Sequence, residues 1–144
     1  MVIRAYHKED QEAVVDLWMK CGLVVPHNNP ISDIERKLKV NPEWFLVGVI
    51  EDEVVATCMA GYEGHRGWIN YLAVRPDLQS QGFGKQIMDH AESLLTKAGC
   101  PKINLQIRST NQKAIGFYES IGYKKDRVVS MGKRLEPDRP YTAE

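Results

Sequence analysis

The sequence lacks a long apolar run and an excess of charge of either sign. Its longest uncharged apolar run, Trp44 to Ile50, is far shorter than the roughly 20 residues that a helix needs to cross a bilayer. The N-terminus also lacks the hydrophobic region of a signal peptide, so we expect a cytoplasmic protein with no membrane partner. Nineteen Lys and Arg balance nineteen Asp and Glu, so no overall positive field attracts nucleic acid, and any anion site must be local.

Cysteine is scarce as well. Cys21, Cys58 and Cys100 are odd in number, widely separated and without CxxC or Cys/His spacing, so they predict buried thiols and neither disulfides nor a metal site. The chain has 144 residues, 43% of them hydrophobic, which is enough for one core. We expect a single domain over residues 1–135 and a flexible tail over residues 136–144, which are rich in charge and contain two prolines.

Apolar periodicity and turn residues predict strands that alternate with helices. Two hairpins are expected in the middle of the chain, because short turn-like segments separate the β-branched runs there. A mixed sheet with helices on its faces, an α/β (α+β) class, follows from this order. The expected strands are 2–5, 44–50, 54–60, 68–74, 102–107 and one long or two short strands in 123–135; the expected helices are 11–21, 32–39, 85–98 and 112–120.

The most informative segment runs from Leu72 to Lys85. Pro76 ends a strand there, and a loop with Gly82 and Gly84 leads directly into a helix. The unpaired first N–H groups of such a helix and the positive end of its dipole favour an anion, so a diphosphate would fit with Lys85 in reach. The spacing matches neither the P-loop nor the GxGxxG dinucleotide motif, and the alternative is that the glycines only make a tight connection.

Two motifs together resemble the GNAT family of acetyl-CoA-dependent N-acetyltransferases over residues 2 to 135. The first is Gln79-x-x-Gly82-x-Gly84 after a strand that ends Leu-Ala-Val-x-Pro, and the second is Asn111-x-x-Ala114-x-x-Phe117-Tyr118-x-x-x-Gly122-Tyr123. The stretches 34–37, 61–67 and 99–103 are similar to small bacterial acetyltransferases of the YpeA type. The resemblance implies a GNAT-like fold, with a mostly antiparallel central sheet whose fourth and fifth strands splay apart.

The resemblance also implies roles for particular residues. Leu72 and Val74 would pair with the pantetheine arm of acetyl-CoA, and the Leu72 N–H would donate to the thioester carbonyl. Asn111 would bind the pantetheine arm, and Tyr118 would protonate the thiolate as general acid; its alternative is a tyrosine that packs a helix on the sheet. The main-chain amides of one loop would hold the pyrophosphate: Gln79, Gln81, Gly82, Phe83, Gly84 and Lys85.

The base that deprotonates the acceptor amine stays open. Gln106 and Trp68 stand where two branches of the family place a glutamate, which leaves Glu63, His65 or Glu35 as candidates. The acceptor itself is open between a small amine, an amino acid and a peptide amine. The loop of residues 21–30, with His27 and Asn28, is expected to form the acceptor side. The alternative function is an acyl-CoA-binding sensor without turnover. The resemblance to the family also implies a possible homodimer.

Overall fold

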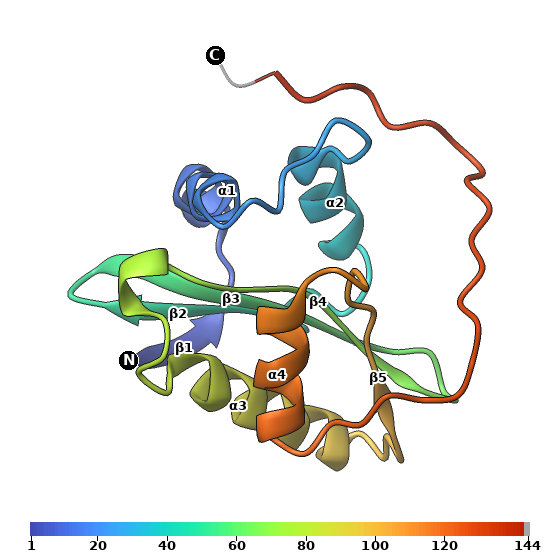
Figure 1. The fold of residues 1–144 in the computed structure, drawn as a ribbon. Coiled ribbons are helices and arrows are strands. Elements are labelled where there is room, and N and C mark those ends of the chain that lie inside the picture. The colour runs from blue at the N-terminus through green and yellow to red at the C-terminus, as the bar shows by residue number, and fades with distance from the viewer. Residues whose placement is uncertain (143–144) are drawn as a thin grey trace. The chain divides into compact units, whose positions relative to one another are not determined.

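The computed structural model describes residues 1–142. The chain divides into two compact units. Unit 1 contains Met1–Asn104 together with the chain from Asp138 onward, and unit 2 is Leu105–Pro137. Unit 1 carries the whole sheet and all helices but one (Figure 1).

The sheet of unit 1 has five strands in the order β1-β2-β3-β4-β5. Neighbours from β1 to β4 are antiparallel, and β5 runs parallel to β4. This mixed, mostly antiparallel sheet is the one expected from the sequence, including both hairpins. The strands are β1 (Val2–Ala5), β2 (Phe45–Ile50), β3 (Glu53–Tyr62), β4 (Gly67–Val74) and β5 (Ile103–Asn104).

The turn between β2 and β3 shows why this hairpin forms. Glu51 and Asp52 connect the strands, and both have positive φ, 50° and 65°. Two left-handed residues in succession match the twist of the flanking strands, as in a type I′ turn, and aspartate tolerates that conformation better than most residues. The short turn fixes the β2–β3 register and thereby which side chains face each side of the sheet.

Helices cover both faces of the sheet in unit 1 (Figure 1). The helices α1 (Gln11–Lys20) and α2 (Pro30–Lys37) lie on one face, and α3 (Phe83–Lys97) lies on the other. On the α1 face, Trp18 is fully buried in a cluster with Phe45 and other apolar side chains. Short 3-10 turns at Lys8–Asp10, Pro42–Trp44 and Pro76–Leu78 complete the unit.

The helix α2 begins earlier than the sequence predicted. The expected capping box of Ser32 and Glu35 does not start it; Asn29 does. The Asn29 side chain accepts hydrogen bonds from the backbone N–H of Ile31 and Ser32, at 3.0 and 3.1 Å. Pro30 then occupies the first turn, where its missing N–H is not needed.

Unit 2 contains α4 (Gln112–Ser120), as predicted, but not the strand expected in residues 123–135. That prediction was wrong for the described residues: these positions form neither helix nor strand, and Val128, Val129, Met131 and Leu135 are exposed. A strand needs a neighbour to pair its backbone, and the sequence of this segment does not show whether one is there. Likewise the strand expected at 102–107 is only Ile103–Asn104.

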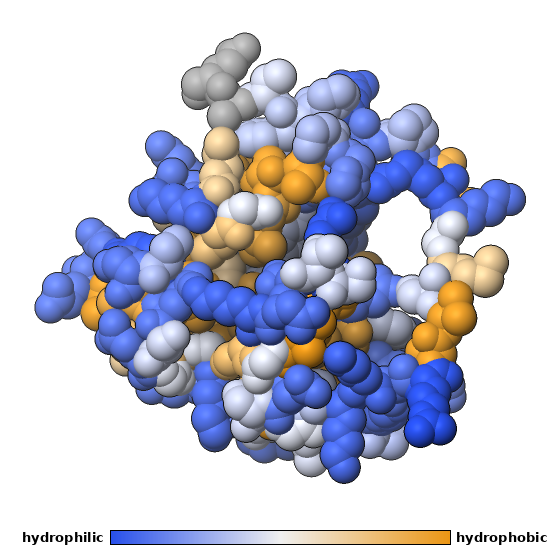
Figure 2. All heavy atoms as spheres, viewed as in Figure 1, coloured by the Kyte–Doolittle hydropathy of each residue, from blue (hydrophilic) through white to orange (hydrophobic). Residues whose placement is uncertain are grey.

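Part of the segment expected to be a flexible tail makes defined contacts within unit 1. The Arg36 guanidinium is 2.6 Å from the Asp138 carboxylate, and the Asn29 side-chain amide donates to the Arg139 carbonyl at 3.0 Å. Tyr141 packs, half-buried, against the core of unit 1. Hydrophilic residues occupy most of the face shown in Figure 2. Among residues 1–142, no helix is long and apolar enough to span a membrane.

Candidate functional site

The loop from β4 to α3 is held together by its own glutamines. The Gln79 side-chain amide donates to the Val74 carbonyl at 2.9 Å, and the Gln81 amide donates to the Asp77 carbonyl at 3.4 Å. These two bonds close the loop around the 3-10 turn Pro76–Leu78. The side chains of Gln79 and Gln81, two of the predicted cofactor residues, therefore stabilise the loop, and we expect its backbone to contact the ligand.

The start of α3 presents main-chain donors. Gly82 precedes the helix with φ of 88°, a left-handed conformation that glycine adopts without steric cost, and it has no side chain to cap the helix. The first helical bond runs from the Gln86 N–H to the Gly82 carbonyl at 3.1 Å, so the amides of Phe83, Gly84 and Lys85 precede the helical pattern. A Cβ placed on Gly82 would meet no atom within 4 Å, so this side of the loop is open.

These features suit an anion. The amides at the helix start point out of the helix, and the helix dipole places positive potential behind them. Lys85, expected to reach a diphosphate, is 2.8 Å from the Asp89 carboxylate, and both side chains are exposed. The Asp89 carboxylate raises the pKa of Lys85, so the Lys85 ammonium stays charged.

A bulge interrupts the pairing of β3 with β4. Thr57 pairs with Ala73, but the next pair is Met59 with Asn70. Cys58 therefore lies opposite two residues, Tyr71 and Leu72, and Tyr71 has a left-handed φ of 51°. Leu72, the predicted donor to the thioester, thus belongs to an irregular part of the strand.

The other edge of β4 carries a very short ladder. Only Gly67 and Trp68 pair with β5, so among the described residues β4 from Ile69 to Val74 has no strand ladder on that edge. This agrees with the expectation of fourth and fifth strands that diverge. An extended ligand can pair with such an edge because its backbone groups are not used by a neighbouring strand.

The loop on the expected acceptor side is braced by Asn28. Its side-chain oxygen accepts from the Val25 N–H at 2.7 Å, while its amide nitrogen donates to the Leu23 carbonyl at 3.3 Å and to the Tyr71 hydroxyl at 2.8 Å. His27 is exposed in the same loop. The Asn28 side chain therefore connects this loop to the bulge of β4.

Two predicted site residues belong to unit 2. Asn111 caps α4, because its side-chain oxygen accepts from the Ala114 N–H at 3.1 Å. Tyr118 packs edge-on against Phe117 and Tyr123, with ring centroids 5.1 and 5.6 Å away. Both residues therefore have local structural contacts within unit 2, beside the catalytic and binding roles that the resemblance implies.

The candidate bases are surface groups. The Glu63 carboxylate accepts from the backbone N–H of His65 at 3.0 Å and from that of Arg66, so it closes the turn between β3 and β4. His65 is exposed there, and Glu35 is exposed on α2. Neither Gln106 nor Trp68 can act as a base; Gln106 donates to the Ser130 hydroxyl within unit 2. Which group takes the proton from the amine stays open.

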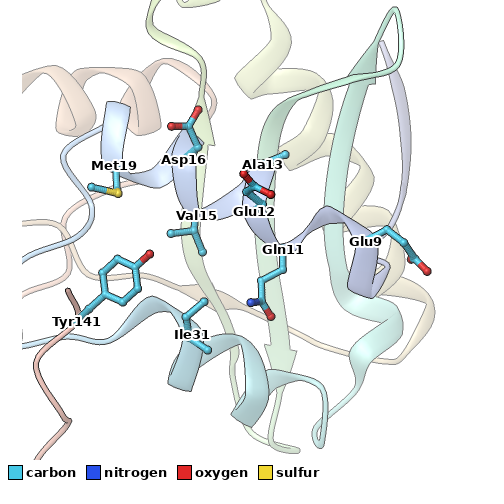
Figure 3. A pocket seen from close by; sticks show the side chains of 9 residues that line it. All are labelled: Glu9, Gln11, Glu12, Ala13, Val15, Asp16, Met19, Ile31 and Tyr141. Carbon is cyan, nitrogen blue, oxygen red and sulfur yellow. The ribbon is translucent and has the colours of Figure 1, made fainter. Parts of the chain in front are cut away.

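A separate pocket of about 630 Å³ lies along α1 in unit 1 (Figure 3). Figure 3 shows carboxylates on the α1 side and the Tyr141 ring near Ile31. None of the predicted cofactor residues lines this pocket. It is therefore a different feature from the loop at the start of α3.

The cysteines are all unpaired thiols. Only Cys58 is fully buried, and burial raises its pKa to about 12; Cys21 and Cys100 are half-buried, so the expectation of buried thiols holds for one of the three. Within residues 1–142, no three His, Cys, Asp or Glu side chains gather where they could hold a metal ion.

The chain is similar to known proteins along most of its length. The model of the acetyltransferase (GNAT) family matches residues 7–123. An acetyltransferase of Pectobacterium atrosepticum is 43% identical over 141 residues, which cover 98% of this chain and 100% of that protein. An acetyltransferase of Sodalis glossinidius is 44% identical over 142 residues, with the same coverage of both chains.

Solved structures agree with this. The crystal structure of Ard1 from Thermoplasma volcanium superposes with a TM-score of 0.73 at 25% identity, covering 84% of this chain and 80% of that one. The strand–loop–helix geometry, the sheet and the family match give one answer: the chain belongs to the GNAT acetyltransferase family. The family expected from the two sequence motifs is therefore confirmed.

Sequence analysis did not identify Tyr71, Asp33 or Thr57 as site residues. The Tyr71 hydroxyl donates to the Asp33 carboxylate, and the Thr57 hydroxyl donates to the Tyr71 carbonyl. The only sequence signal was position: Tyr71 immediately precedes Leu72 in a strand already assigned to the cofactor. Contacts between residues so far apart in the chain leave no local pattern.

Proposed function

We propose that this protein transfers an acetyl group from acetyl-CoA to a primary amine by direct attack of the amine on the thioester. The observation that supports this proposal most strongly is one continuous segment, in which the bulge of β4 is followed by the open, uncapped start of α3. Membership of the GNAT family supports the same reaction. The acceptor is a small amine, an amino acid or a peptide amine.

The residues of unit 1 would bind the cosubstrate. The amides of the loop from Gln79 to Lys85 would hold the pyrophosphate, with the open side of Gly82 admitting it. The backbone of Leu72 and Val74 would pair with the pantetheine arm along the edge of β4 that β5 does not cover. The Leu72 N–H would donate to the thioester oxygen as negative charge develops there, which is worth roughly 3 kcal/mol for one well-placed donor.

Two residues of unit 2 carry the other roles that the family resemblance implies. Asn111 offers its side-chain amide to the pantetheine arm, since its oxygen is already used to cap α4. As the amine nitrogen bonds to the carbonyl carbon and the carbon–sulfur bond breaks, Tyr118 would give its proton to the sulfur. Phenol and thiol have pKa values near ~10 and ~8.5, which makes this transfer feasible when the site disfavours a bare thiolate.

The amine must be neutral to attack. An alkyl ammonium with a pKa near ~10.4 has to lose its proton first, to water or to one of Glu63, His65 and Glu35. After attack the nitrogen loses a second proton, which would restore the Tyr118 phenol directly or through water, so the products are the amide and CoA thiol. Cysteine has no role in this direct transfer. The cytoplasmic location and the homodimer expected from the sequence stay predictions.

Acetyl-CoA binding and turnover test the proposal together. At 100 times its dissociation constant, acetyl-CoA should stabilise the protein by about 2.7 kcal/mol in thermal unfolding, and a panel of amines should release CoA thiol. Gly82→Trp should weaken acetyl-CoA binding at least tenfold. Gly64→Trp is the matched control, because Gly64 also has positive φ, 104°, and also has no atom within 4 Å of a Cβ.

The outcomes separate the alternatives. Absence of stabilisation by acetyl-CoA in the folded wild type contradicts the proposal. Binding without thiol release on any amine favours the acyl-CoA sensor instead. Equal affinities in the Gly82 and Gly64 variants would show that the pyrophosphate lies elsewhere.

A further inference from the structure

Tyr71 is held at both ends of its side chain. Its hydroxyl donates to Asp33 Oδ2 at 2.5 Å and accepts from Asn28 Nδ2 at 2.8 Å. Its ring stacks on the ring of Trp18, with centroids 3.9 Å apart and planes within 20°. The groups that hold it come from α1, from the loop after α1 and from α2. Three segments of unit 1 therefore converge on one residue of the bulge.

The backbone of Tyr71 is anchored as well. The Thr57 hydroxyl donates to the Tyr71 carbonyl at 2.8 Å and accepts from the Trp18 indole N–H at 2.8 Å. This matters because Tyr71 has a φ of 51°, a conformation that an L-residue with a bulky side chain rarely adopts. Such a conformation persists only when the surroundings hold it, and these contacts supply the hold.

The protonation state of Tyr71 restricts what it does. Burial and the neighbouring Asp33 carboxylate both raise the pKa of Tyr71 above its ordinary value of about 10. The side chain is therefore a neutral phenol at physiological pH, with its proton directed at Asp33. Because it is neither ionised nor aimed away from Asp33, it does not serve as the base for the amine.

We propose that Tyr71 is a positioning residue for acetyl transfer: its anchors hold the β4 bulge and so keep the Leu72 N–H directed at the thioester carbonyl. This inference rests on the proposed function, which assigns that donor to Leu72. A donor helps only when it is aimed at the oxygen where charge develops, and small displacements lose most of the benefit. Asn28 and Asp33 act through Tyr71, so the loop that faces the acceptor also supports the donor.

The first test removes the Tyr71 hydroxyl and keeps its ring. We expect Tyr71→Phe to lower kcat about tenfold while KM for acetyl-CoA changes less than twofold, because the donor acts mainly in the transition state. Tyr62→Phe is the matched control, since the Tyr62 hydroxyl donates to the Gly64 carbonyl at 3.1 Å in the β3–β4 turn, away from the bulge. It should leave both constants unchanged.

A spectroscopic measurement separates positioning from mere stability. The probe is a ketone analogue of acetyl-CoA, with CH₂ in place of sulfur and ¹³C at the carbonyl. Wild type and Tyr62→Phe should shift the bound carbonyl resonance downfield, as a hydrogen bond does, and Tyr71→Phe should reduce that shift by at least half. A lower melting temperature with unchanged kcat and carbonyl shift would overturn the inference and leave Tyr71 a structural residue.

A second pair tests the same link if Tyr71→Phe does not fold. Asp33→Asn keeps an oxygen that accepts the phenol proton, whereas Asp33→Ala removes it. We expect Asp33→Asn to retain at least half of kcat and Asp33→Ala to lose about as much as Tyr71→Phe. Equal kcat and carbonyl shift in both Asp33 variants contradicts the inference. Failure of the proposed function is distinct, because the wild type itself would then neither bind the analogue nor release thiol.

Discussion

Thr57 offers the sharpest test of how the bulge is held. It is fully buried on β3 and joins the Trp18 indole N–H to the Tyr71 carbonyl through one hydroxyl, with both distances 2.8 Å. Thr57→Val keeps the shape of the side chain but removes both hydrogen bonds. Each polar group left buried without a partner costs about 1–3 kcal/mol, and the added methyl returns about 1 kcal/mol. We therefore expect a loss of roughly 3 kcal/mol in the free energy of unfolding.

Urea unfolding at 25 °C measures this loss. With a denaturant slope of about 1.5 kcal/mol/M, the midpoint should fall by about 2 M. Thr57→Ser is the control, because it keeps the hydroxyl and loses one methyl, at a cost of about 1 kcal/mol. The reasoning is refuted if Thr57→Val is no less stable than Thr57→Ser. That result would mean that the Trp18 N–H and the Tyr71 carbonyl do not depend on Thr57.

Two further predictions concern a carboxylate and a phenol. Hydrogen bonds from the Arg4 guanidinium, at 2.7 and 3.0 Å, and from the His7 N–H lower the pKa of Asp10. The ionised Asp10 therefore stabilises the folded protein fully above its unfolded pKa of about 3.9. This stabilisation is lost as the pH falls through the lower pKa of the folded state. Asp10→Asn should cost about 1–2 kcal/mol at pH 7, allowing for the exposure of Arg4, and this difference should shrink as the pH falls below about 3.9; a constant difference in urea unfolding across pH 3–7 would contradict this. Tyr118→Phe should lower kcat at least tenfold with little change in acetyl-CoA affinity, and an unchanged rate with chemistry rate-limiting would remove Tyr118 from the acid role.

Local signals predicted the parts of the fold that depend on neighbours in sequence. Charged residues between two β-branched runs marked the β2–β3 turn, where Glu51 and Asp52 now show positive φ. Apolar residues at helical spacing marked α3, and the match to α4 extends to both ends. The main-chain donors at the start of α3 were predictable for the same reason, because a glycine before a helix has no side chain to pair with the first N–H groups. Their role in binding pyrophosphate is still a prediction.

Features that depend on distant partners were not predictable in the same way. Residues 123–135 include the β-branched pair Val128 and Val129, but the sequence does not say whether a strand edge is there to pair with. The start of α2 was misplaced because Asn29 competes with Ser32 as a cap, and only the folded loop decides between them. The bulge at Tyr71 depends on Thr57, Trp18 and Asp33, which are scattered along the chain.

The two groups of donors that we propose for acetyl-CoA lie at departures from regular structure. A regular strand uses its N–H groups in ladders, and a well-capped helix uses its first N–H groups on a side chain. Here the bulge places Leu72 where the β3–β4 pairing is irregular, and Gly82 starts α3 without a side-chain cap. The uncapped start of α3 costs stability locally, because oriented donors without partners are unfavourable. The anchors on Tyr71 fit the role that we propose for it, because a donor that is to meet the thioester in a fixed orientation must be held by the protein before the ligand binds.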